Sequence, residues 1–303
     1  MSDSTASLRR KIASAGDLRS VVRTMKALAA SSIGQYEESV AALGDYARTV
    51  DLGLGECFRQ GGLMATPSDV MRRARPDDIG AVVFGSDQGL VGRFNEIVVE
   101  HAIAALAALP GKPRVWAVGE RVHARLADAG VRLSGLYAVP TSVRAITPLV
   151  GQILVANETR TSQGQAAVLY LFYNRHSAAG AYAPVSQRLL PLDESWRREL
   201  AHGRWPTALL PEVMGFSSAT LRALIREYLF VSLFRACAES LASEHASRLV
   251  AMERADRNID ELLQSMQGTF HRLRQSGIDE ELFDVVSGFE ALTPPSQRPK
   301  EAR

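Results

Sequence analysis

LASEHASRLVAMERADRNIDELLQSMQGTFHRLRQSGIDEELFDVVSGFEAL, residues 241–292, belongs to a region without proline, residues 212–293. Its apolar residues fall in two adjoining seven-residue rows, of which Asp256 interrupts the second: Met252, Ile259, Met266 and Leu273; Leu249, Leu263 and Phe270. Proline would remove a backbone donor and clash with the preceding turn, so this region can form an uninterrupted helix. The pattern predicts one helix from about Ser217 to Leu292, on the order of 110 Å long.

The N-terminal region, residues 1–66, also lacks proline and carries a similar pattern. One row recurs every seven residues: Leu8, Ala15, Val22, Ala29, Tyr36, Leu43 and Val50. A companion row holds Ile12, Ile33, Val40, Ala47 and Leu54, with Leu18 and Met25 one place earlier. Spacings of three and four over about seven heptads predict a second long helix with one narrow apolar seam, as in a coiled coil. Helices of this length exceed a compact domain, so part of the pair should project and pack against another protein.

The middle of the chain, residues 67–211, changes period and contains most of the prolines. Short apolar segments bounded by turn residues predict strands at 80–84, 114–118, 131–137, 166–173 and 185–192. Helical stretches at 95–109, 120–129 and 143–160 alternate with the first four strands, which favours a parallel sheet. We therefore expect a small Rossmann-like α/β domain at 67–211, between long helices at 1–66 and 212–292, and a disordered tail at 293–303.

Composition is that of an ordinary globular protein, with 303 residues, 46% of them hydrophobic and 22% charged. A formal charge of +2 is too small to indicate a nucleic-acid partner. The two cysteines, Cys57 and Cys237, form no metal or redox motif and are expected to be free buried thiols. The chain also shows no secretory signal and no apolar run of about 20 residues, so a cytoplasmic location is expected.

The segment most suggestive of chemistry is VVFGSDQGLVGRFN, residues 82–95, where glycines follow a predicted strand. It matches neither a Walker loop nor GxGxxG, and a tight strand-to-helix turn is the favoured interpretation. The histidines form no HExxH pair, and the paired acids fall on helix faces that need charge anyway. We thus predict no catalytic, cofactor or metal residues. Two alternatives stay open: a nucleotide-binding enzyme that uses this loop, and a free coiled-coil adaptor.

Three segments resemble a known family. TMKALAASSI, residues 24–33, is similar to the first-helix signature of gamma subunits of F-type rotary ATP synthases and ATPases. GSDQGLVGRFN, residues 85–95, resembles their glycine loop, and residues 241–263 with 270–292 resemble their C-terminal helix nearly end to end. With the order of long helix, α/β domain and long helix, the resemblance covers the whole chain.

The resemblance implies a non-catalytic rotor shaft. Its antiparallel coiled coil would stand in a hexamer of alpha and beta subunits, and its α/β part would lie near an epsilon-type subunit and the membrane rotor ring. Rotation would couple ion flow to conformational change at the catalytic beta subunits, at the cytoplasmic face of a bacterial inner membrane. Met25 and Lys26 match a family pair that faces the lever region of beta, and Arg274 and Gln275 match a pair that touches its catch loop.

Two departures from the family pattern stand out. Where the family has small residues and then Ile-Thr-Gln-Glu after the Arg-Gln pair, this chain has Ser276, Gly277, Ile278, Asp279, Glu280 and Glu281. Arg93 occupies the second glycine-loop position before Phe94 and Asn95. This divergence suggests one of the alternative rotary ATPases that some bacteria carry beside a main enzyme.

Overall fold

The computed structural model describes residues 4–59, 79–109, 113–162, 168–176, 182–209, 211 and 217–292. The predicted tail at 293–303 and the predicted junction at residues 66 and 67 lie outside the described residues. The chain forms two compact units. The first joins residues 1–26 with 252–303, and the second consists of residues 27–251.

The first unit is a pair of helices. One helix of the pair is the start of α1 (Thr5–Ala42), and the other is the end of α8 (Ser217–Leu292). The bounds of α8 confirm the predicted C-terminal helix. The guanidinium of Arg9 lies 5.5 Å from the Phe270 ring, whereas Lys26 pairs with Glu253, so the two helices run antiparallel. The seam between them buries Leu8 and Val22 from one row of α1, and Met252, Ile259 and Leu263 from both rows of α8. Leu18 of the companion row is instead 54% exposed, so the seam is narrower than predicted.

We predicted one long helix at residues 1–66. The structure instead divides the N-terminal stretch into two helices. α1 ends at Ala42, and α2 (Gly44–Arg59) begins after a single intervening residue, Leu43. Gly44 is a weak helix former, and the bond from Leu43 N to Ser39 O, at 3.3 Å, is long for a helix. The chain therefore has a joint at Leu43 in the second unit.

The second unit is built on a five-stranded sheet with the order β3-β2-β1-β4-β5. Its strands are β1 (Ile79–Phe84), β2 (Arg114–Val118), β3 (Leu133–Tyr137), β4 (Val168–His176) and β5 (Tyr182–Leu190). The predicted parallel pairing holds for the first four strands. β5 runs antiparallel to β4 and forms an edge, because a short connection brings the chain straight back beside β4.

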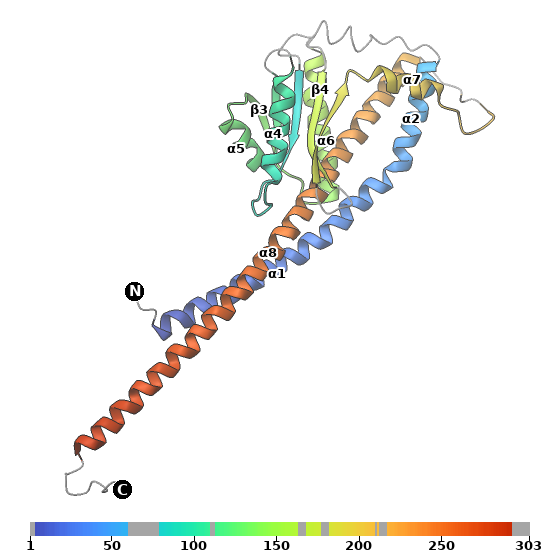
Figure 1. Ribbon diagram of the computed structural model, residues 1–303. Helices are drawn as coiled ribbons and strands as arrows, with labels where there is room; N and C mark the ends of the chain where they lie inside the picture. Colours follow the sequence, from blue (N-terminus) through green and yellow to red (C-terminus); the bar gives the residue numbers. More distant parts are fainter. Residues whose placement is uncertain are drawn as a thin grey trace. The chain divides into compact units, whose positions relative to one another are not determined.

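Helices cover both faces of this sheet (Figure 1). α4 (Phe94–Ala107) and α5 (Glu120–Asp128) pack on one face over Val83, Ala117 and Phe172. α6 (Val143–Ser162) and α8 pack on the other face over Val82 and Leu171. Strand β1 is buried on both faces, which explains its continuous apolar sequence.

A short helix that the sequence pattern did not indicate, α7 (Glu194–His202), follows β5. Asp193 caps it by accepting hydrogen bonds from the backbone N–H groups of Ser195 and Trp196, at 2.9 and 3.1 Å. Its apolar side packs against α2 and α8 in a small second core. α7 thus ties the end of α2 to the sheet domain.

Candidate functional site

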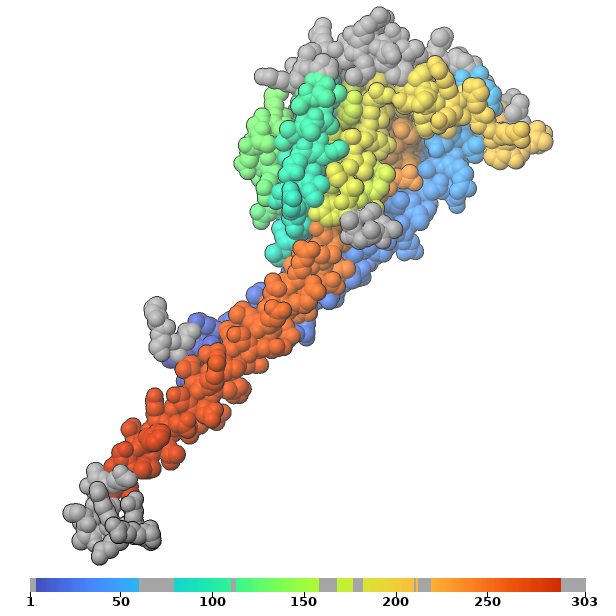
Figure 2. All heavy atoms as spheres, in the orientation of Figure 1, coloured from blue at the N-terminus to red at the C-terminus, as the bar shows by residue number. Residues whose placement is uncertain are grey.

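The end of α8 carries an apolar stripe. Ile278, Leu282, Val285, Val286 and Phe289 follow helical spacing on one face, and between 47% and 72% of each side chain is exposed. On the face of the molecule that Figure 2 shows, no other coloured segment lies over this end of the helix within its unit. Glu280, one of the acidic residues that depart from the family pattern, lies exposed outside this face, and Asp279 lies exposed at its edge, seven residues before Val286. An exposed apolar stripe of this length is typical of a surface that packs against another protein.

Arg274 and Gln275 lie one turn before this stripe, and both side chains are exposed. Arg272, close by, donates from Nη2 to the Thr269 hydroxyl over 3.3 Å. The predicted Arg-Gln pair is therefore presented to the solvent at the base of the terminal stripe. Its position allows contact with a partner, and such contact is part of the proposal below.

Met25 and Lys26 lie on α1 of the same unit, and both are half-buried. The Lys26 Nζ atom is 3.6 Å from Glu253 Oε1 across the helix pair. Arg274 lies 21 residues beyond Glu253 on α8, or roughly 30 Å at the rise of an α-helix. The structure thus separates the two predicted pairs into two places along the shaft.

Leu18 and Val21, each 54% exposed, form a second apolar stripe with Met25 on the outer side of α1. Their spacings of three and four residues resemble those of a buried seam, so the sequence pattern assigned Leu18 and Met25 to seam packing. One signal could have distinguished these exposed residues from seam residues: this segment holds more apolar side chains than one narrow seam can bury.

Asp256, which interrupts the apolar row of α8, is explained by arginines of α1. Arg19 Nε lies 3.1 Å and Arg23 Nε 3.4 Å from Asp256 Oδ1, and Arg19 Nη1 lies 2.7 Å from Asp260 Oδ1. The hydrogen bond from Arg19 and the charge of Arg23 lower the pKa of Asp256. The interruption is a polar clasp that fixes the register of the two helices.

The glycine loop, residues 85–93, joins β1 to α4 at the point where the strand order reverses. This is where doubly wound sheets bind ligands. Here the first turn of α4 places a side chain in the loop. Asn95 Oδ1 accepts from Ser86 N over 3.0 Å, and its Nδ2 donates to Ser86 Oγ over 2.9 Å. A Cβ on Gly85 would lie 2.4 Å from Val122, so the loop is packed closely onto α5.

The N-terminus of α5 is likewise occupied by a protein carboxylate. Asp87 Oδ1 accepts from Glu120 N over 2.9 Å, and its Oδ2 accepts from Val139 N over 3.0 Å. Gly119, with φ of +117°, lets the backbone pass so close that a Cβ would meet Ser86 at 2.8 Å. The backbone N–H groups of Gly85, Ser86 and Glu120 are therefore already bonded within the protein, and this geometry favours the tight-turn interpretation of the loop.

The glycine loop is tied to α8. Ser247 Oγ donates to Val91 O, and Ser243 Oγ donates to Asn174 O over 3.0 Å. Asn174 in turn donates from Nδ2 to Phe94 O over 2.9 Å. Movement of α8 within this unit would therefore be transmitted directly to the loop and the sheet.

Beside this contact α8 carries a buried ion pair. Arg248 Nη2 lies 2.6 Å from Glu244 Oε1, and the two residues are only 7% and 5% exposed. Burial raises the pKa of Glu244, whereas Arg248 lowers it. His245 stacks on Tyr36 of α1 at 5.6 Å, and burial lowers its pKa to about 4, so it is neutral at physiological pH. These groups form a polar joint between α1 and α8.

Other kinds of site find little support in the described part of the chain. Its described residues contain no group of three or more His, Cys, Asp or Glu side chains that could hold a metal ion. Cys57 and Cys237 are both buried and free, and burial raises the pKa of each thiol. None of the helices in the described ranges has the apolar length that a bilayer span requires.

A long antiparallel helix pair with exposed apolar stripes, in one chain with a small α/β domain, defines the class of this protein. A family model described as ATP synthase matches residues 4–292. The chain belongs to this ATP synthase family.

Known relatives agree with this assignment. The ATP synthase gamma chain of Xanthomonas campestris is 26% identical over 288 residues, which cover 94% of this chain and 98% of that one. A chain of the Euglena gracilis mitochondrial ATP synthase, solved as the OSCP/F1/c-ring in rotational state 3, is 16% identical with a TM-score of 0.66, covering 99% of this chain and 98% of that one. A chain of the Tetrahymena thermophila central stalk and c-ring is 21% identical with a TM-score of 0.51, covering 78% of this chain and 99% of that one. The latter two show a shared fold.

Proposed function

We propose that this chain is the gamma-type rotor shaft of a rotary ATP synthase or ATPase, a non-catalytic subunit that couples ion flow to conformational change at catalytic beta subunits. The observation that carries the proposal is the stripe at the end of α8, whose apolar side chains stand 47–72% exposed on one face. A collar of alpha and beta subunits around this stripe would bury it, and burial of apolar side chains is favourable.

The partners follow from the same assignment. The α/β domain would bind an epsilon-type subunit and the rotor ring, which would hold the chain peripherally at the cytoplasmic face of a bacterial inner membrane. The contacts around the glycine loop support a mechanical role for this domain, because Ser86 N and Glu120 N are bonded within the protein and Ser243 and Ser247 anchor α8 to the sheet and the loop. These internal bonds favour a tight turn over the nucleotide-binding alternative.

Arg274 and Gln275 are proposed to contact a catch loop on beta, and Met25 and Lys26 its lever region. An exposed guanidinium can form charged hydrogen bonds with a partner carboxylate, which are stronger than neutral ones. Replacing Arg274 by Ala should therefore lower coupled ATPase activity, by about tenfold if one charged bond is lost. Arg272→Ala, two residues earlier and also exposed, is the matched control and should leave the activity nearly unchanged.

The direct test is coexpression with the alpha and beta subunits of the same organism. We expect one copy of the chain per hexamer and an ATPase activity that depends on it. The triple variant Ile278→Gln, Leu282→Gln, Phe289→Gln should lose most of this activity, because it removes the apolar stripe. Neutralising three acids outside the stripe, Asp279→Asn, Glu280→Gln and Asp284→Asn, provides the control. Full activity of the stripe variant, or a stable ATP-binding particle without alpha and beta, would contradict the proposal.

A further inference from the structure

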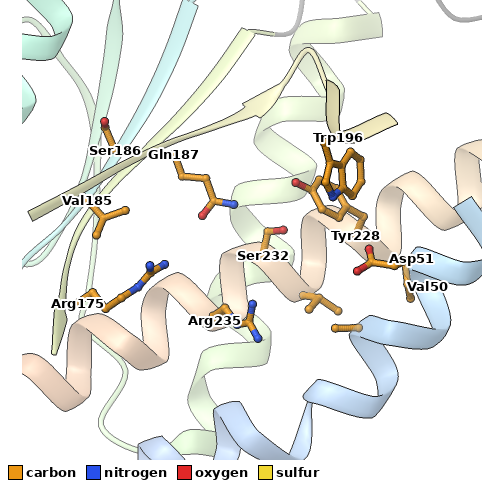
Figure 3. A pocket seen from close by; sticks show the side chains of 12 residues that line it. Val50, Asp51, Arg175, Val185, Ser186, Gln187, Trp196, Tyr228, Ser232 and Arg235 are labelled. Atoms are coloured by element: carbon orange, nitrogen blue, oxygen red, sulfur yellow. The ribbon is translucent and has the colours of Figure 1, made fainter. Parts of the chain in front are cut away.

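A cleft of about 350 Å³ lies within the second unit, between β5, α2, α7 and α8 (Figure 3). Part of its wall is apolar and aromatic. The rings of Trp196 and Tyr228 lie 4.7 Å apart, and Val50, Val185 and Val231 also line the cleft. Figure 3 shows Val185 beside Arg175, away from the two rings. The volume and the mixture of aromatic wall with a few polar groups are those of small-molecule sites in proteins.

Two arginines reach the same cleft from different elements. Arg175 of β4 and Arg235 of α8 both have half of the side chain exposed. They share Glu239, whose carboxylate lies 2.7 Å from Arg175 Nε but 4.0 Å from Arg235 Nε. Since the Arg235 contact is longer than a hydrogen bond, this guanidinium has donors free to bind an anion.

The other polar groups of the cleft set its charge and direction. Asp51 of α2 is half-buried, and its burial raises the pKa of its carboxyl group while Arg235 lowers it. The Tyr228 hydroxyl hydrogen-bonds with Ser232 and Gln187. The lining thus carries two guanidiniums and one carboxylate. The Glu239 carboxylate is bonded to Arg175 and offsets its charge, so Arg235 is the guanidinium of the pair that can bind an anion.

We propose that this cleft binds a small amphiphilic carboxylate, with its planar apolar body against Trp196 and Tyr228 and its carboxylate on the Arg235 guanidinium. Arginine forks bind carboxylates through two parallel hydrogen bonds. Trp and Tyr rings stack with planar groups at little entropic cost. A bound ligand would bridge α2, β5 and α8, and would stabilise their arrangement by mass action. This inference is independent of the proposed rotor function.

The test is calorimetric titration of the purified full chain with 2-naphthoate and with its neutral isostere, 2-naphthamide. Binding of the carboxylate should saturate at one per chain, and the amide should bind about tenfold more weakly, because it offers no charge to the arginines. Arg235→Gln should weaken naphthoate binding by about tenfold. Arg198→Gln is the control, since Arg198 lies on α7, is 72% exposed and pairs with Glu194.

A second variant, Asp51→Asn, tests the same site without changing an arginine. Asp51→Asn removes the negative charge that faces the arginines and should tighten naphthoate binding by about twofold or more. Equal affinities for the carboxylate and the amide would overturn the proposal. So would unchanged or weaker carboxylate binding by Asp51→Asn. Failure of the chain to assemble with alpha and beta would count against the rotor function and leave this result intact.

Discussion

Asp256 shows how a single residue can break an apolar pattern and still support the fold. A carboxylate in the second row of α8 would weaken a purely apolar seam. Its contacts with Arg19 and Arg23 turn the break into a clasp between two helices that otherwise pack through similar side chains. Polar residues in such seams are known to select one register over others.

Asp256→Asn should lower the melting temperature of the chain at neutral pH by a small amount. The arginines lower the pKa of Asp256 in the folded state, so its contribution is present above the unfolded value of about 3.9 and is lost as the pH falls through the lower folded value. Melting curves of both proteins from pH 7 to pH 3 should therefore converge toward acid. A difference that stays constant over this range would show that the clasp is not electrostatic.

The buried Glu244–Arg248 pair should respond more strongly. Arg248→Met leaves a carboxylate that is 5% exposed without its partner and should cost about 3 kcal/mol of stability. Because burial raises the pKa of Glu244, the loss should grow as the pH rises above the ordinary value of about 4.3.

Denaturant unfolding at pH 4 and pH 8 measures this effect. The double variant Arg248→Met, Glu244→Gln is the control and should recover much of the stability, since no buried charge is left. If the double variant is no more stable than Arg248→Met at pH 8, an unpaired carboxylate is not the cause of the loss.

At the scale of elements, periodicity predicted the long helices and the parallel strands well. α8 begins at Ser217 and ends at Leu292, as predicted, because this part of the chain has no proline to interrupt a helix. The joint at Leu43 could not be predicted, because Gly44 alone does not decide between a weak helical residue and a break. α7 depends on the Asp193 cap and on packing against α2, and the second contact is far away in the sequence.

The site was predictable to a lesser degree. Family resemblance selected Arg274 and Gln275, and the structure shows both exposed. The outer stripe of Leu18, Val21 and Met25 was hidden, because apolar residues at spacings of three and four look alike whether they face a partner helix or another subunit.

The difference between the buried seam and an exposed apolar position can be measured within one helix pair. Met252→Ala, at a side chain that is 2% exposed, should destabilise the pair by about 2–3 kcal/mol. Leu262→Ala, at 53% exposure, should change stability by less than about 0.5 kcal/mol. Hydrogen exchange of the backbone amides around residue 259 reports on this pair directly. Equal effects of the two substitutions would mean that the seam is not the source of its stability.

At the scale of the whole molecule, the contacts within each unit suit the transmission of mechanical force. Each unit is held by many small contacts: a seam with a polar clasp in one, and a sheet anchored to α8 through Ser243 and Ser247 in the other. Packing spread along helices transmits torque without depending on any single bond. The proposed rotation requires such distributed contacts.

Single-molecule rotation tests this central claim most directly. Cys57 and Cys237 are buried, so a cysteine introduced at the exposed Asp128 of α5 can be labelled selectively with a bead. With the alpha-beta hexamer fixed to a surface, addition of ATP should turn the bead in one direction. A stoichiometric, ATP-hydrolysing complex whose bead stays still would contradict the rotor function of this chain.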